Sequence, residues 1–177
     1  MQRYWSRSVK SALFASLVSA VAATVMLPLV SSAADMVSSA DRAFVAKVSQ
    51  GGMFEVALGR LAQTQGSRQD IRDQGATEAH DHMLVGAKLK AVAGDAGITF
   101  PSTLNVMFSR KLASLRALSG RAFDAEYLQA MKDIHAKDGA AFAKEAGDGT
   151  DPKLRAFASE THRIVLRHIG ELGAIGP

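Results

Sequence analysis

The sequence of 177 residues contains no cysteine, only four prolines and a single tryptophan. The absence of cysteine excludes disulfide frameworks, zinc ribbons, iron–sulfur clusters, thiol nucleophiles and lipid attachment at a cysteine. Few prolines, together with plentiful alanine, favour helices over a turn-rich β-sandwich. The length suits one domain. No motif identifies a substrate, so the sequence leaves open whether the protein is an enzyme.

The start of the chain, positions 1–34, has the pattern of a secretory signal peptide. Arg3, Arg7 and Lys10 form a basic start, no charged residue occurs from position 12 to 30, and small residues occupy positions 31–34. This order predicts export and cleavage after Ala33 or Ala34, which places a mature domain of residues 35–177 in the periplasm. The apolar run is also long enough to span a bilayer, so an uncleaved membrane tether is the alternative.

Removal of this segment changes the charge balance. Loss of its three basic residues leaves 18 Lys and Arg against 17 Asp and Glu. A mature chain this close to neutral lacks the electrostatic pattern of a nucleic-acid-binding protein, so we do not expect nucleic acid as a partner.

Five segments carry helical signals, and none alternates as a strand does. Short connections fold consecutive helices back antiparallel, so four long helices and one shorter helix predict an all-α four-helix bundle. Ser39 or Asp41 is expected to cap the first helix, and Asp151 followed by Pro152 is expected to start the fifth. The expected helices cover residues 39–65, 67–96, 102–117, 121–146 and 151 to about 172.

Residues spaced alternately by four and three predict which side of each long helix faces the core. These inward faces are apolar except where an acid or a histidine interrupts them. Glu55 and Glu78 lie ten and eleven residues from the turn between their helices, so at about 1.5 Å rise per residue they are level. Interruptions on all four faces predict a polar cluster inside the bundle, formed by Glu55, Glu78, His82, His135, Asp138 and His168.

Carboxylates and imidazoles that converge inside a four-helix bundle are the ligands of di-iron and di-manganese proteins, although the strict Glu-x-x-His spacing is absent here. Nitrogen and oxygen ligands without thiolate suit iron, manganese, zinc or copper. The sequence therefore predicts a transition-metal site, with Asp81 hydrogen-bonded to His82 beside the ligands. The predicted ligands are Glu55, Glu78, His82, His135 and His168.

A purely structural interpretation stays open for each of these residues. Glu55 could pair with Arg60 or Arg72, and the histidines could bond to neighbouring aspartates. The protein would then be a non-catalytic cell-envelope or stress-related binding module whose buried histidines only specify packing. Of the other histidines, His80 is expected in solvent, whereas His162 adjoins an inward face.

Several motifs also carry a family resemblance: Gly51-Gly52-Met53-Phe54-Glu55, Asp81-His82, the break from Gly97 to Pro101, Phe123-Asp124, Tyr127-Leu128, and Lys137-Asp138 after His135. With them, residues 39–172 resemble the exported bacterial family called domain of unknown function 4142. The resemblance implies a ferritin-like fold without an established activity. It carries over Glu55, Asp81, His82, His135 and His168 as recurrent acids and histidines. This chain differs from the family pattern at Glu78, Ile134 and His162-Arg163.

Overall fold

Five α-helices make up most of the part of the chain that the computed structural model describes, residues 37–176. The all-α prediction of four long helices and one short helix is confirmed, and no strand occurs within residues 37–176. No helix in this described part is long and apolar enough to cross a membrane. The predicted signal peptide lies outside the described residues. The helices are α1 (Ser39–Gln65), α2 (Gln69–Asp95), α3 (Val106–Arg116), α4 (Gly120–Asp148) and α5 (Pro152–Ala174).

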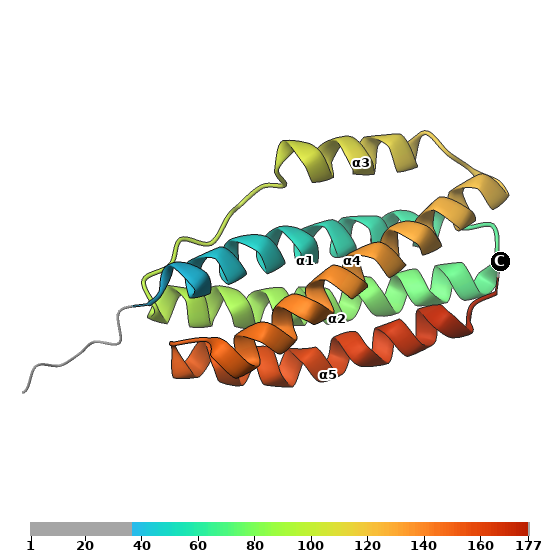
Figure 1. The fold of residues 1–177 in the computed structure, drawn as a ribbon. Coiled ribbons are helices and arrows are strands. Elements are labelled where there is room, and N and C mark those ends of the chain that lie inside the picture. Colours follow the sequence, from blue (N-terminus) through green and yellow to red (C-terminus); the bar gives the residue numbers. More distant parts are fainter. Residues whose placement is uncertain (1–36, 177) are drawn as a thin grey trace, which may run out of the picture. The chain divides into compact units, whose positions relative to one another are not determined.

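The four long helices form a bundle in which each contacts two others (Figure 1). α1 packs against α2 and α4, and α5 packs against the same two helices. α2 ends at the end of the bundle where α1 begins, whereas α4 begins at the opposite end. The connection from α2 to α4 therefore runs the length of the bundle, and α3 lies within it, beside α1 and α4. The ferritin-like assignment stays a prediction.

The ends of α1 and α5 are set by side-chain caps. α5 begins as predicted, because Asp151 accepts the backbone N–H groups of residues 153 and 154, and Pro152 occupies the first helical position. The N-cap of α1 is Ser38, so the predicted caps Ser39 and Asp41 are wrong. Asp41 is instead the third helical residue of a capping box. The Asp41 carboxylate accepts the backbone N–H of Ser38, and Ser38 Oγ accepts the backbone N–H of Asp41.

α3 begins at Val106, later than the expected start near residue 102. Gln50 of α1 holds the preceding loop: its Nε2 donates to the Thr103 carbonyl at 3.0 Å, and its Oε1 accepts the Asn105 N–H at 2.7 Å. Asn105 then caps α3 by accepting the Phe108 N–H at 2.9 Å. Contact with α1 thus overrides the local helical signal.

Two buried aspartates fix the hairpins α1–α2 and α4–α5 against each other. Asp41, near the start of α1, accepts the backbone N–H groups of Thr150 and Asp151, in the turn between α4 and α5, at 3.0 and 3.2 Å. Asp124, near the start of α4, accepts the Ser67 N–H, in the turn between α1 and α2, at 2.9 Å. Such charge-assisted hydrogen bonds are strong, and they set the level of one hairpin relative to the other.

The interior consists of two apolar clusters with a polar layer between them. One cluster contains Phe54 and Tyr127, and the other contains Phe44 and Phe157. The buried acids and histidines in the middle of the long helices stand between residues of the two clusters: Glu55, Glu78, His82, His135, Asp138 and His168. Apolar burial on both sides therefore stabilises the backbone positions from which the polar layer is built.

α1 and α2 approach most closely at two glycines. A Cβ atom on Gly59 would lie 2.6 Å from the Gly75 carbonyl oxygen, and one on Gly75 would lie 2.7 Å from the Gly59 carbonyl oxygen. Only glycine fits this crossing without a backbone shift. It lies about one helical turn from Glu55 and from Glu78, so the two backbones are close where the polar layer begins.

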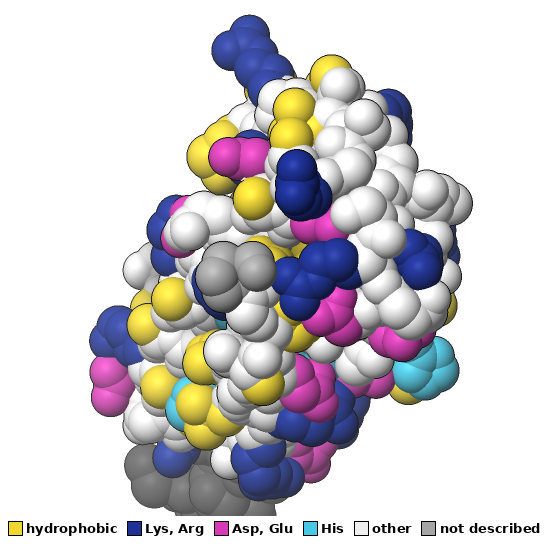
Figure 2. Space-filling view, turned by 90° about the vertical axis from the view of Figure 1, so that its right-hand side faces the viewer, with side chains coloured by type: hydrophobic (Ala, Val, Ile, Leu, Met, Phe, Trp, Pro, Cys, Tyr) yellow, Lys and Arg dark blue, Asp and Glu magenta, His cyan; other side chains and the backbone are white. Residues whose placement is uncertain are grey.

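Charge on the surface is mixed. On the face drawn in Figure 2, Lys and Arg side chains lie among Asp and Glu side chains. Exposed ion pairs include Lys111 with Glu126 at 3.2 Å and Lys153 with Asp95 at 2.7 Å. That face therefore carries no extended field of one sign.

Candidate metal centre

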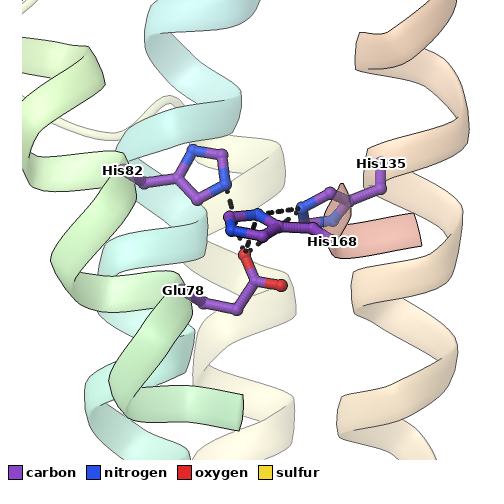
Figure 3. A group of neighbouring side chains, drawn as sticks. All are labelled: Glu78, His82, His135 and His168. Atoms are coloured by element: carbon purple, nitrogen blue, oxygen red, sulfur yellow. Dashed lines mark hydrogen bonds and ion pairs between the residues drawn. The ribbon is translucent and has the colours of Figure 1, made fainter. Parts of the chain in front are cut away.

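Four side chains of the polar layer direct one donor atom each to a common point (Figure 3). Glu78 and His82 come from α2, His135 from α4 and His168 from α5, and none is more than 4% exposed. The Glu78 Oε2 atom lies 3.2 Å from His82 Nε2, 3.2 Å from His135 Nε2 and 3.1 Å from His168 Nδ1. The last two nitrogens are 3.2 Å apart.

Four of the six separations between these donor atoms are close to those in a tetrahedral metal site. When metal–ligand bonds are about 2.0–2.1 Å long, the ligand atoms of a tetrahedron are about 3.3–3.4 Å apart. The four donor–donor distances above are 3.1–3.2 Å, and all four donor atoms lie within 4.8 Å of one another. Three imidazole nitrogens and one carboxylate oxygen form a donor set that could hold zinc, iron, manganese or copper.

Each imidazole has its second nitrogen against an acceptor outside this group. His82 Nδ1 lies 3.1 Å from Glu55 Oε2, and His168 Nε2 lies 3.0 Å from Asp81 Oδ2. His135 Nδ1 donates at 2.9 Å to the backbone carbonyl one helical turn before it. When the outer nitrogen of a ring carries the proton, the inner nitrogen presents a lone pair to the common point. The surroundings thus favour the tautomers that a metal ligand needs.

Without a bound cation, protons on the imidazoles and the charge of Glu78 stabilise each other in this cluster. Burial would raise the pKa of Glu78, but hydrogen bonds with His135, His168 and His82 outweigh it, so the pKa lies below its usual value. Burial would lower the pKa of His135 and of His168, but the Glu78 carboxylate outweighs it and raises both. The contacts therefore favour the ionised form of Glu78 and the protonated forms of His135 and His168, compared with the same groups in water.

Glu55 and Asp138 are two further buried carboxyl groups next to the four donors. Burial raises the pKa of Glu55 to about 8, and the nearby Asp138 and Glu78 charges add to the effect of burial. Burial likewise raises the pKa of Asp138 to about 6. The pKa values of Glu55 and Glu78 thus shift in opposite directions. Three imidazoles lie within 3.2 Å of one Glu78 oxygen, whereas each Glu55 oxygen has a single imidazole beside it.

The predicted site residues divide into ligand candidates and their neighbours. Glu78, His82, His135 and His168 converge, whereas Glu55 lies outside this group, against the far nitrogen of His82. Asp81 contacts His168 instead of His82, its neighbour in sequence. Consecutive helical residues point about 100° apart, so Asp81 faces α5 while His82 faces the bundle axis. The exposed Arg167 binds Asp81 from the solvent side.

Sequence reasoning missed two contributions to the site. The carbonyl of Met131 orients His135 and, as a backbone group, has no signal in the sequence. The second is Gln74, a buried side chain four residues before Glu78 on α2, whose Nε2 donates to Glu78 Oε1 at 2.8 Å. Of the remaining histidines, His80 is exposed, as predicted, and His162 is half-buried outside the four-donor group.

Fold and cluster together define an all-α bundle protein that encloses three histidines and a glutamate between its helices. Residues 27–175 match the family described as Domain of unknown function (DUF4142), so the chain belongs to that family and the resemblance is confirmed. Searches of curated proteins and of solved structures found no match.

Proposed function

We propose that this protein binds one transition-metal ion between α2, α4 and α5. The ligands are Glu78, His82, His135 and His168. One observation carries the proposal: four buried donors converge, four of their six separations are 3.1–3.2 Å, and each imidazole is oriented by an outer acceptor. In this assignment Glu55, which the sequence suggested as a ligand, orients His82.

The residues of this chain prepare the position for the ion. Packing above and below the polar layer holds the rings, and the outer acceptors increase the basicity of the imidazoles. The donor set suits zinc, iron, manganese or copper, and the bound ion would supply Lewis-acid chemistry or, for a redox-active metal, electron transfer.

Metal content of the purified protein tests this proposal. We expect about one equivalent of metal by plasma mass spectrometry of untagged protein, and loss of most of it in Glu78→Gln and His135→Ala. His162→Ala is the matched control, because His162 lies outside the four-donor group and should leave metal content unchanged. Absence of metal from the wild-type protein, even after anaerobic reconstitution, would contradict the proposal.

We also propose that the protein works in the periplasm after cleavage of the segment at positions 1–34. The basic start, the uncharged run and the small residues at positions 31–34 support export. Intact mass spectrometry of the protein from its native host checks this. A mass that corresponds to cleavage after Ala33 or Ala34 is expected, whereas a full-length mass in the membrane fraction indicates a tether.

A second candidate function is a non-catalytic envelope module whose cluster serves packing alone. The distances of 3.2 and 3.1 Å from Glu78 Oε2 to His135 and His168 favour it, because this carboxylate raises the pKa of both imidazoles and so favours ion pairs that need no metal. A chelator separates the candidates. Removal of a bound ion should cost about 3–4 kcal/mol at saturating metal and lower the melting temperature, whereas a cluster held by protons should not respond.

A further inference from the structure

A second group of acids lies at the edge of the polar layer. Glu55 of α1 and Asp138 of α4 are only 1% and 5% exposed. Both line a pocket of about 460 Å³ between α1, α2 and the loop after α2, and His82 lines it as well. Apolar side chains such as Phe100 and Leu104 form much of the remaining wall. The two carboxylates are therefore the acidic part of a mainly apolar pocket.

Gly51 of α1 leaves room for the carboxylate of Asp138, which belongs to α4. A Cβ atom at Gly51 would overlap that carboxylate, whereas a Cβ atom at the neighbouring Gly52 would meet no atom within 4 Å. Gly51 also lies one helical turn before Glu55, on the same side of α1. Asp138 thus lies against α1 on the side from which Glu55 projects.

The hairpin contacts bring these two acids to the same level. Asp41 and Thr150 mark one end of the bundle. Glu55 follows Asp41 by about four helical turns, and Asp138 precedes Thr150 by a little more than three. At about 1.5 Å rise per residue, these separations correspond to roughly 21 and 18 Å from the same end. The two carboxylates therefore lie at nearly equal depth on neighbouring antiparallel helices.

One oxygen of Glu55 is left without a donor. Oε2 faces His82 Nδ1 at 3.1 Å, whereas the buried Oε1 has no hydrogen-bond partner among residues 37–176. His135 Nδ1 lies 3.4 Å from Oε1, but its proton goes to the Met131 carbonyl. A buried carboxyl oxygen without a donor is costly when the group is ionised, and either a proton or a cation would offset that cost.

We propose that Glu55 and Asp138 form a second cation-binding position, distinct from the site of three histidines and a glutamate. Its carboxylate oxygens suit a hard divalent cation such as Mn²⁺, which completes its coordination with water from the pocket. The charge of the nearby Lys47 acts on Asp138, and its ammonium group donates to the Lys137 carbonyl at 2.9 Å. The proposal goes beyond the proposed function, which gives Asp138 no role.

Manganese binding to the full chain preloaded with zinc tests the second position. Electron paramagnetic resonance detects free Mn²⁺, so its signal falls as Mn²⁺ binds. Asp138→Asn should weaken binding about tenfold or more, because affinity for a hard cation depends on the number of charged ligands. Gly51→Ala should also weaken it, since the new methyl group displaces the carboxylate without removing its charge. Asp133→Asn, on the exposed side of α4, and Gly52→Ala are the matched controls.

The outcomes separate the two sites. Weakened Mn²⁺ binding in Asp138→Asn and Gly51→Ala, with both controls like the wild type, supports the second position whether or not zinc occupies the histidine site. If the wild type binds no Mn²⁺, or if all four variants bind it equally, the second position is refuted. Failure of the wild type to retain zinc counts against the proposed function instead. Melting curves of each variant exclude a loss of binding that follows from unfolding.

Discussion

Replacing Glu78 by Gln keeps the volume of the side chain and removes its charge at a position with no exposed surface. The lost carboxylate oxygen lies 3.1–3.2 Å from three imidazole nitrogens. In the metal-free protein at acidic pH, protonated His135 and His168 would then lose the carboxylate that they share, and Asp81 beside His168 would not replace it at His135. Removing one partner of a buried ion pair costs about 3–5 kcal/mol. For a domain of this size, that corresponds to a fall of roughly 10–20 °C in melting temperature.

The pH dependence of this loss identifies its cause. The loss should be large at about pH 6 and smaller at about pH 9, where the imidazoles release their protons and no charge is left unpaired. Circular dichroism during heating of chelator-treated protein measures both values. Glu160→Gln, in the exposed ion pair with Lys88, is the control and should leave the melting temperature unchanged. An equal loss at both pH values, or a loss below about 1 kcal/mol at pH 6, would refute the reasoning.

As pH rises, the stability of the metal-free protein should fall while the stabilisation gained from bound metal should increase. Glu55 binds a proton up to about pH 8 when folded but only to about pH 4.5 when unfolded, so the metal-free protein should lose stability as pH rises between these values. Stabilisation by zinc should grow over the same pH range, because the metal ligands must be deprotonated to bind zinc. Calorimetry with and without zinc measures both pH dependences. If stability changed with pH in the same way with and without zinc, this prediction would be wrong. Gly59→Ala should lower the free energy of unfolding, measured in urea, by about 1–3 kcal/mol, because the new methyl group overpacks against α2. Gly86→Ala is the control and should not destabilise the protein, because a Cβ atom at Gly86 would meet no atom within 4 Å. Asp41→Ala should cost about 1.5–3 kcal/mol at neutral pH. The pKa of Asp41 is lowered to about 2, so its contribution is present above pH 3.8 and disappears as pH falls toward 2; an unchanged acid unfolding profile in the variant would contradict this.

Local patterns were sufficient to identify all four converging donors. Glu78 and His82 are four residues apart and therefore share one side of α2, while His135 and His168 interrupt otherwise apolar faces of α4 and α5. A buried polar residue on an amphipathic helix is visible in the sequence, since its neighbours three and four positions away are apolar. The inward direction of each donor was thus predictable.

The roles of Glu55 and Asp81 depended on which helices became neighbours. Glu55 faces the far nitrogen of His82, and Asp81 reaches His168 from the side of α2 that packs on α5. Both acids are on the expected helix, but the packing of three helices determines which ring each one contacts. Hydrogen bonding to a specific ring nitrogen depends on positions of about an ångström, which periodicity does not resolve.

The sequence by itself determined the helices, the two hairpins and the residues that face inward, because periodicity, caps and short turns act within a few residues of the chain. The tertiary structure alone decided the level of one hairpin against the other. Glu78 lies eleven residues after Ser67, and His135 lies eleven residues after Asp124. Because Asp124 binds Ser67 across 57 positions of sequence, both donors lie about 16 Å from that contact and meet at one level.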